Sequence, residues 1–359
     1  MSAEAPGRRN GRRAGAVTSH DVARAAGVSQ STVSRVLRRE SHIAPATRER
    51  VLAAVEQLGY IPSDVGRSLS TRSSRTIGIV VTDLTSVFYP YIAAPLHDEV
   101  TGSGYRMALF TEGVESDAAP TVEAVRPLLD RLLDRSIDGV VLSTSRLDGV
   151  VPRELQRRSL PFVFLTRHVE GIAADSAVVD NSLGASLAAG EAIRLGHERI
   201  GAIFGPENTS TGRDRERGVR ATLAAAGVEL PDALVRRGPF NYEVGHEAMT
   251  ELLRAPERPS VVLCSNDTVA IGALNAAHGL GVSVPDDVSL VGFDDLPMAA
   301  WEVFSLTTVR QPMEEMARTS VRLLLDRIEG IVDPTTVRQR VFEPEMVMRR
   351  TLVPPRGRR

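Results

Sequence analysis

Hydrophobic and polar residues follow two different patterns along this chain of 359 residues. Through roughly the first sixty positions, apolar side chains recur every three or four residues, which predicts short amphipathic helices. From Thr76 onward, short β-rich apolar runs alternate with helical stretches. This alternation predicts an α/β region of parallel sheets with helices on both faces, and about 270 residues of it predict two similar lobes.

The strands and helices predicted in the second region alternate along the chain. The predicted strands are Thr76–Val81, Met107–Phe110, Gly139–Leu142, Pro161–Leu165, Arg199–Ile203, Ser260–Cys264 and Val288–Val291. The predicted helices are Ile92–Thr101, Thr121–Arg135, Ser182–Leu195, Gly218–Ala226, Tyr242–Leu253 and Val269–His278. In open α/β sheets, ligands bind beyond the carboxyl ends of strands. The polar and aromatic residues that follow these runs are therefore candidates for a cleft between the lobes.

The N-terminal pattern predicts two short helices in close contact. Thr18 and Asp21 have the spacing of a capping box, which opens a helix that Gly27 ends. Ser29 is placed to cap a second helix that runs to Leu37. Small residues around Gly27 allow the close approach that a helix-turn-helix requires. A third helix is predicted from about residue 45 to residue 58.

The second of these helices exposes hydrogen-bonding side chains. Val33, Val36 and Leu37 form its inward face. Its outward face carries groups suited to base edges and phosphates, namely Gln30, Ser31, Thr32, Ser34 and Arg35.

Charge separates the two regions further. Residues 1–75 hold 13 arginines and six acidic residues, a net charge of +7, whereas the remainder carries −9. A basic end on an acidic body indicates a polyanionic partner for the N-terminal part. The only cysteine, Cys264, excludes an intramolecular disulfide and is typical of a reducing compartment. With neither a signal peptide nor a long apolar run, the protein is predicted to be cytoplasmic, on the nucleoid, without membrane contact.

The N-terminal residues resemble the headpiece of the lac-repressor (LacI/GalR) family of bacterial regulators. The segments that carry the resemblance at fixed spacing are Val17–Leu37, Thr47–Val51 and Gly59–Pro62. The resemblance implies that the helix from Ser29 to Arg35 lies in the DNA major groove, with Gln30 and Ser31 as the main specificity pair. It also implies contacts to DNA from Thr18, Thr32, Ser34 and Arg35.

The next segment, Ser63–Ser70, resembles the hinge helix of the same family. The resemblance implies that Leu69 is the leucine that wedges into the minor groove and kinks the DNA. Gly66 and Asp64 depart from the family pattern. Gly66 costs about 1 kcal/mol of helix propensity relative to alanine, and Asp64 places an acidic side chain near phosphates.

The resemblance extends through the body of the chain. Ser265–Ala273 and Val288–Asp295 are similar to the family's effector-domain signatures. They imply a two-lobed domain that resembles periplasmic sugar-binding proteins. In such a domain the chain crosses between the lobes three times, here near Val179, Val309 and Phe342. Carried over residue by residue, the resemblance implies hydroxyl-binding roles for Arg215, Asn266 and Asp294, an aromatic wall at Phe240, and further lining from Phe88 and Tyr89.

Two positions bear on which effector is bound. Thr166 replaces an aspartate that binds sugar in many relatives, and Thr209 replaces an arginine of the purine-responsive relative. Neither position identifies a ligand, but Thr209 favours a sugar or polyol over a purine.

The sequence is thus identified as a homodimeric, DNA-binding regulator, a repressor of a pseudo-palindromic operator, controlled by a small molecule that is a carbohydrate. The expected divisions are a disordered arginine-rich tail (1–16), a headpiece (17–61), a hinge helix and linker (62–74) and an effector domain (75–345). Lobe 1 is expected at about 75–178 and 310–341, and lobe 2 at about 179–309 and 342–350.

Three other classes of protein share parts of this pattern. A transport solute-binding protein requires an export signal and no headpiece. A sugar-modifying enzyme requires a catalytic pair, for which Asp267 and Asp294 are the candidates, and a nucleoid protein would bind any duplex equally. No phosphate-binding loop, nucleophile elbow, dinucleotide fingerprint or metal cluster is recognisable, so we expect no cofactor, no metal and no catalysis.

Overall fold

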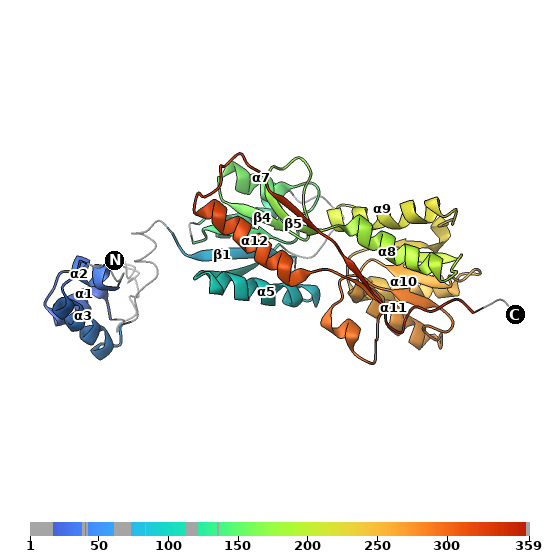
Figure 1. The fold of residues 1–359 in the computed structure, drawn as a ribbon, viewed down its shortest axis with the longest axis horizontal. Helices are drawn as coiled ribbons and strands as arrows, with labels where there is room; N and C mark the ends of the chain where they lie inside the picture. Colours follow the sequence, from blue (N-terminus) through green and yellow to red (C-terminus); the bar gives the residue numbers. More distant parts are fainter. Residues whose placement is uncertain are drawn as a thin grey trace, which may run out of the picture. The chain divides into compact units, whose positions relative to one another are not determined.

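The computed structural model describes residues 17–37, 40, 42–60, 73–82, 84–112, 121–134 and 136–356. The chain divides into two compact units, Met1–Ser74 and Arg75–Arg359 (Figure 1). The predicted arginine-rich tail and the hinge positions Asp64, Gly66 and Leu69 lie outside the described residues. The division into units falls between the predicted linker and the predicted effector domain.

The first unit contains three short helices, α1 (Ser19–Ala26), α2 (Gln30–Leu37) and α3 (Pro45–Gln57). The predicted capping box is present at α1, where Thr18 and Asp21 each bond the other's backbone N–H. Gly27 ends α1 with φ +64°, a left-handed conformation that favours glycine. The buried core of the unit consists of Val22, Ala23, Ala26, Val33, Val36, Val51 and Ala54.

The second unit contains two parallel sheets, as the alternation of elements predicts. The larger has the order β11-β5-β4-β3-β1-β2 and defines lobe 1, while the smaller has the order β7-β6-β8-β9 and defines lobe 2. Lobe 1 strands are β1 (Thr76–Val81), β2 (Arg106–Thr111), β3 (Gly139–Leu142), β4 (Phe162–Leu165), β5 (Asp175–Val179) and β11 (Gln339–Phe342). Lobe 2 strands are β6 (Ile200–Phe204), β7 (Val235–Arg237), β8 (Val261–Cys264) and β9 (Ser289–Val291).

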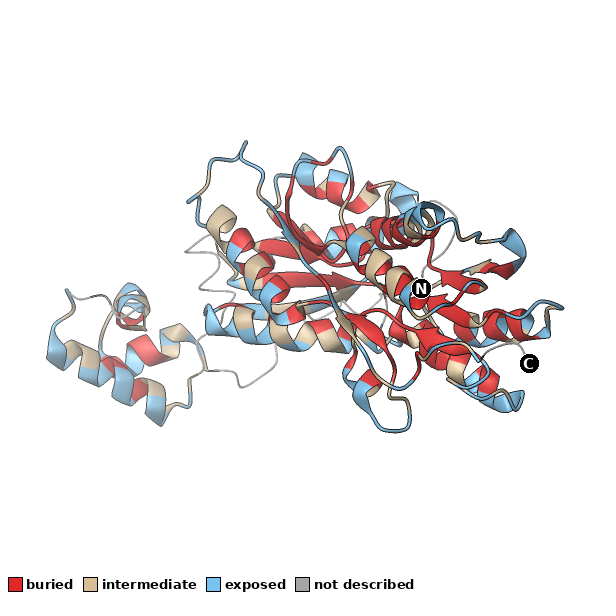
Figure 2. Cartoon of the chain, turned by 45° about the vertical axis from the view of Figure 1, so that its right-hand side comes forward, coloured by how far each residue is buried: buried red, intermediate tan, exposed pale blue. Residues whose placement is uncertain are grey.

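Helices cover both faces of each sheet, which is why the central strands are buried throughout (Figure 2). In lobe 1, α5 (Phe88–Gly102) and α12 (Met313–Ile328) pack on one face, against Ile77 and Ile79. α6 (Val122–Leu132) and α7 (Val150–Arg157) pack on the other, against Val80 and Val140. Successive residues of β1 thus point to opposite cores, as the two-residue period of a strand requires.

Lobe 2 repeats this arrangement. The helices α8 (Asn181–Arg194) and α9 (Ser210–Ala225) cover one face, where Ala202 and Leu263 point. The helices α10 (Tyr242–Arg254) and α11 (Asp267–Gly279) cover the other, where Ile203 and Val262 point. Two 3-10 turns, η1 (Asp232–Leu234) and η2 (Pro297–Ala300), lie in connections of this lobe.

Three segments carry the chain between the lobes. The first leads from β5 into α8, the second contains β10 (Thr308–Arg310) ahead of α12, and the third leads from β11 into β12 (Glu345–Val347). β10 and β12 pair antiparallel, so the second and third crossovers are hydrogen-bonded to each other. Figure 1 shows the last of these, in red, passing from one lobe to the other.

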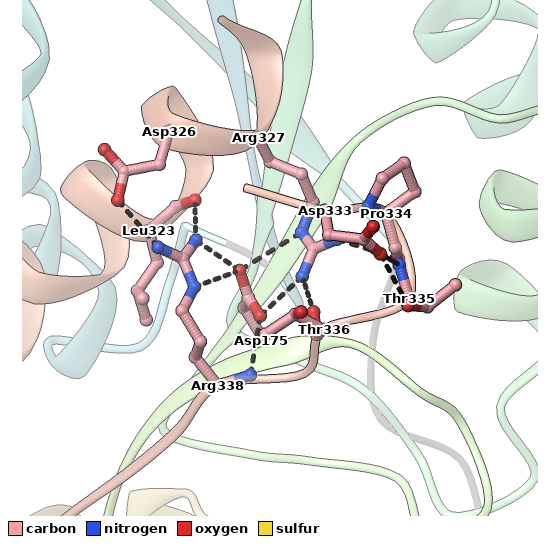
Figure 3. Close-up of polar contacts among 9 residues, drawn as sticks. All are labelled: Asp175, Leu323, Asp326, Arg327, Asp333, Pro334, Thr335, Thr336 and Arg338. Carbon is pink, nitrogen blue, oxygen red and sulfur yellow. Dashed lines mark hydrogen bonds and ion pairs between the residues drawn. The ribbon is translucent and has the colours of Figure 1, made fainter. Parts of the chain in front are cut away.

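A buried carboxylate on β5 links the edge strand β11 and helix α12 to the sheet of lobe 1. Asp175, 1% exposed at the start of β5, accepts hydrogen bonds from Arg327 of α12 and from Arg338, each 2.7 Å long (Figure 3). Burial alone would raise the pKa of Asp175, but the bonds from the two arginines outweigh it and hold the pKa below its ordinary value. The cluster joins α12, the connection after it and β11 to the sheet.

The C-terminal segment is attached to lobe 2 through His197. Its Nε2 lies 2.9 Å from the carbonyl oxygen of Val353 and its Nδ1 2.9 Å from Ser260 Oγ. Both ring nitrogens are thus occupied, and the imidazole links the C-terminal segment to the residue ahead of β8. Within the described part of the chain, no helix is long and apolar enough to cross a bilayer. The described residues also contain no cluster of histidine, cysteine and acidic side chains suited to a metal ion.

Candidate DNA-recognition helix and ligand cavity

Helix α2 presents the side chains that the sequence analysis assigns to DNA. Val33 and Val36 are buried against the other two helices, which leaves the opposite side of α2 in solvent. Ser29, Gln30, Ser31 and Arg35 are exposed there, as is Thr18 ahead of α1, and Thr32 and Ser34 are half-buried. Leu69 lies outside the described residues.

Serine and threonine hydroxyls organise the start of α2. Ser29 Oγ accepts a hydrogen bond from the backbone N–H of Thr32 at 3.2 Å, so Ser29 caps the helix as predicted. The same oxygen lies 2.8 Å from Ser31 Oγ and 2.9 Å from Thr32 Oγ1. Gln30 Nε2 donates to Ser19 Oγ across the turn at 3.4 Å. The hydroxyls of Ser29, Ser31 and Thr32 thus form one hydrogen-bonded group at the start of α2.

A cavity of about 370 Å³ lies between the two lobes of the second unit. Its volume is typical of small-molecule sites. All six residues predicted to bind the effector line it, namely Phe88, Tyr89, Arg215, Phe240, Asn266 and Asp294. Residues as far apart in the sequence as Phe88 and Asp294 are thus brought together at the carboxyl ends of both sheets.

An ion pair forms the polar floor of the cavity. Arg215 Nη2 lies 3.2 Å from Asp294 Oδ1, and the two residues are 6% and 2% exposed. Arg215 also donates through Nε to Asn181 Oδ1 at 2.8 Å and through Nη1 to the Ser265 carbonyl at 2.6 Å. Burial lowers the pKa of Arg215 and raises that of Asp294, in both cases against the attraction of the partner. The two side chains are poorly solvated, and their hydrogen bonds to each other and to the surrounding protein hold them in place.

The amides beside this pair have fixed orientations. Asn266 Oδ1 accepts from the backbone N–H of Val269 at 2.9 Å and caps α11, so its Nδ2 is the atom left to donate to a ligand. Gln311 Nε2 donates to Asp294 Oδ1 at 2.7 Å. Asp294 Oδ1 therefore receives bonds from both Gln311 and Arg215, and Oδ2 is the oxygen left to accept from a ligand.

Aromatic rings form the apolar part of the wall. The guanidinium carbons of Arg167 and Arg215 lie 5.5 and 6.0 Å from the centre of the Phe240 ring. Arg215 also lies over Phe293, at 3.6 Å. On the lobe 1 side, Phe88 and Tyr89 make an edge-to-face pair, and the Tyr89 hydroxyl is 2.6 Å from Thr82 Oγ1. Lobe 1 thus supplies one aromatic wall and lobe 2 the other.

Several lining residues have no ligand-binding role assigned from the sequence. Arg167 and Gln311 are the most polar of them, and Thr82, Ser143, Thr211, Tyr242 and Met298 also line the cavity. Arg167 lies two residues beyond β4, at a strand end that the sequence does mark as a candidate for the cleft. Gln311 follows β10, a three-residue strand whose pattern is too short to indicate its position.

Two residues discussed from the sequence lie outside the cavity wall. Asp267 is fully buried and accepts from the Leu296 N–H at 2.8 Å and from Thr308 Oγ1 at 2.5 Å. Thr209 caps α9 by accepting from the Gly212 N–H at 3.1 Å. The side-chain oxygens of both residues are thus bound to the protein's own groups.

Sequence comparisons agree with this two-part architecture. Residues 18–63 match the model of bacterial regulatory proteins of the lacI family, and residues 189–352 match that of a periplasmic binding protein-like domain. The HTH-type transcriptional repressor PurR of Photobacterium profundum is 33% identical, over 93% of this chain and 98% of its own length. The repressor CytR of Escherichia coli K12 is also 33% identical, over 88% and 91% of the two chains.

Solved structures extend the likeness. A lac repressor dimer bound to operator and the anti-inducer ONPF has a TM-score of 0.82 and 27% identity, covering 94% of this chain and 99% of that one. A complex of the transcriptional regulator CelR with cellobiose has a TM-score of 0.70 and 32% identity, covering 93% and 99%.

A helix-turn-helix unit joined to a two-lobed ligand-binding unit defines a DNA-binding transcription regulator of the repressor type. The chain belongs to the lacI family of bacterial regulatory proteins.

Proposed function

We propose that this regulator binds its operator as a homodimer and that a neutral carbohydrate or polyol, bound between the lobes, controls its affinity for that operator. The arrangement of donors and acceptors around Arg215 and Asp294 carries the proposal. Effector-binding roles for Phe88, Tyr89, Arg215, Phe240, Asn266 and Asp294 are part of it, as are DNA contacts from α2.

Hydroxyl groups fit the polar floor better than other small polar groups do. Asn266 Nδ2 offers a donor, and Asp294 Oδ2 offers an acceptor. A hydroxyl donates and accepts at once, so neighbouring hydroxyls of a sugar satisfy both residues. A carboxylate or phosphate, which only accepts, would leave Asp294 facing a second negative charge. The aromatic ring of Phe240 offers a surface for the apolar face of a sugar ring.

The charges near the cavity also support a neutral ligand. Arg215 is compensated by Asp294. Burial raises the pKa of Glu112, and the nearby guanidinium of Arg167 offsets part of that rise, so Arg167 has an acidic side chain in its vicinity. The CelR complex supports the same class of ligand, since that relative was solved with cellobiose.

Binding rather than catalysis is part of the proposal. Among the described residues, the carboxylates that line the cavity are Asp294, held by Arg215 and Gln311, and Glu243, which is exposed on the first turn of α10. Asp267, the other catalytic candidate, is hydrogen-bonded inside the protein. We therefore assign these groups to recognition of a ligand that leaves unchanged.

A thermal-shift survey with the full chain tests the proposal. Neutral mono- and disaccharides, including cellobiose, are compared with uronates, sugar phosphates and purine bases. At least one neutral sugar should raise the melting temperature, and Asp294→Asn should reduce that rise, whereas Asp130→Asn, a change at an exposed aspartate of α6, should preserve it. Stabilisation by a purine or a sugar acid alone would contradict the proposal.

A further inference from the structure

The two lobes contact each other at a place that contains none of the crossovers. The backbone N–H of Leu147 donates to the Asn208 carbonyl oxygen at 2.8 Å, and the backbone N–H of His168 donates to Ser210 Oγ at 3.1 Å. Arg213 Nη2 lies 2.8 Å from Glu170 Oε1. Leu147, His168 and Glu170 belong to lobe 1, while the three partners belong to lobe 2. We call these six residues the seam.

The seam adjoins the cavity on both of its walls. In lobe 1, His168 directly follows Thr166 and Arg167, which line the cavity. In lobe 2, Ser210 and Arg213 alternate along the first two turns of α9 with Thr211 and Arg215, which also line the cavity. A change in the separation of the seam residues therefore changes the distance between the cavity walls.

We propose that Glu170 and Arg213 are positioning residues, which hold the two walls at the separation at which one ligand touches both. The part that Glu170 and Arg213 play in ligand binding rests on the proposed function. Their part in keeping the seam closed does not depend on it. Arg167 of lobe 1 lies over Phe240 of lobe 2 in this arrangement, so residues of both walls are already close together when the seam is closed.

The ion pair is the adjustable part of the seam. The side chains of Arg213 and Glu170 are 32% and 68% exposed, so water and salt weaken their attraction. Exposed pairs of this kind contribute enough to change an equilibrium about two- to fivefold. Arg213 is also held by Asp214, whose Oδ1 accepts from its Nε at 3.0 Å, so Glu170 is the better residue to change.

Cysteine labelling without any ligand tests the proposal. Ser210 is fully buried in lobe 2, so the thiol of Ser210→Cys becomes accessible to an aromatic disulfide reagent when the seam opens. The single native cysteine, Cys264, is buried, and burial raises the pKa of its thiol, which keeps background labelling slow. Glu170 lies in the other lobe, so any effect of Glu170→Gln on this rate passes through the seam.

Glu170→Gln should raise the labelling rate of Ser210→Cys about two- to fivefold. Sodium chloride at high concentration should raise the rate in the Ser210→Cys protein but not after Glu170→Gln, because the screened pair is then absent. The matched control is Glu154→Gln, which removes an ion pair with Arg157 inside α7 of lobe 1 and should leave the rate unchanged.

A rate unaffected by Glu170→Gln, or raised equally by Glu154→Gln, would overturn the proposal. If Ser210→Cys does not fold, the effects of Glu170→Gln and Glu154→Gln can be compared in protein that keeps Ser210. The quantity measured is then the amide hydrogen-exchange rate at Leu147, whose backbone N–H bonds across the seam. Neither measurement involves a sugar. A negative labelling result therefore does not contradict the proposed sugar effector, and a negative thermal-shift survey does not contradict the role of the seam.

Discussion

Arg215 Nη2 and Asp294 Oδ1 lie 3.2 Å apart at the bottom of the cavity, and both side chains are nearly inaccessible to solvent. Arg215 enters from the first half of α9, and Asp294 follows β9 with φ +117°, a conformation that an aspartate rarely adopts. The pair is thus fixed by two different elements of lobe 2. Because Arg215 and Gln311 both bond Oδ1 of Asp294, its Oδ2 is left for a ligand.

Removing the charge of Asp294 should separate effector binding from DNA binding. Asp294→Asn removes a charged acceptor, and hydrogen bonds to charged groups are worth about 1.5–3 kcal/mol. We expect affinity for the stabilising sugar to fall about 10- to 150-fold, with operator affinity retained because α2 belongs to the other unit. Calorimetry and operator titration on the same preparation measure both. A sugar affinity equal to that of the unmodified protein would remove Asp294 from the binding site.

Arg35 and Gln30 should contribute to DNA binding in different ways. Arg35→Ala removes an exposed cation from α2, so affinity for operator and random DNA should fall together, with a shallower dependence on salt. Titrations at several salt concentrations measure the slope. An unchanged slope would contradict a phosphate contact.

Substitution of Gln30 should instead change which bases are preferred. A glutamine side chain pairs through two hydrogen bonds with adenine in the major groove, and such pairs discriminate by about 1–3 kcal/mol. Selection from a randomised operator library with Gln30→Ala should relax the preference at one symmetric pair of positions. An identical consensus would show that Gln30 does not read bases.

The Asp175 cluster should account for much of the stability of lobe 1. Asp175→Asn leaves Arg327 and Arg338 without their shared carboxylate, and breaking a buried ion pair costs about 3–5 kcal/mol. Chemical denaturation measures the loss. Glu191→Gln, which breaks the solvent-accessible pair with Arg194 in α8, is the matched control and should cost less than about 1 kcal/mol. Equal losses for the two variants would contradict the account of the cluster.

His197 should make stability depend on pH on the acid side of neutrality. Burial lowers the pKa of His197 in the folded protein, so the unfolded chain binds its proton more readily. Stability therefore falls as the pH decreases below the unfolded pKa of about 6.5, down to the lower folded pKa. Denaturation at pH 5.5 and 7.5 should show this loss. His197→Gln should flatten it, leaving the smaller slope that His168, whose pKa burial also lowers, contributes.

Much of the architecture was predictable from local patterns, and the unpredicted edge strand has a physical reason. β1 and β3 have the predicted bounds because both are short continuous apolar runs buried on two faces. β11 was not predicted, since it is an edge strand whose Arg340 and Val341 are exposed and whose place is set by pairing with β5. α12 was also not predicted, although Met316, Val321 and Leu324 have helical spacing.

The candidate site shows the same limit. Arg215, Asn266 and Asp294 were identified because they match motifs at fixed spacing. Gln311 was not, because its role depends on a hydrogen bond to Asp294 that only the folded chain creates. The seam likewise joins residues about forty to sixty positions apart whose types are ordinary for surface loops.

Operator binding with and without sugar tests the central claim most directly. The operator is first selected from genomic fragments with the purified full chain, and its dissociation constant is then measured by anisotropy in the absence and presence of the stabilising sugar. We predict a preference for operator over random duplex of about 10³-fold or more, and a change of about 5- to 150-fold when the sugar is added. Equal affinity for operator and random DNA, or an operator affinity that no stabilising sugar alters, would contradict the account.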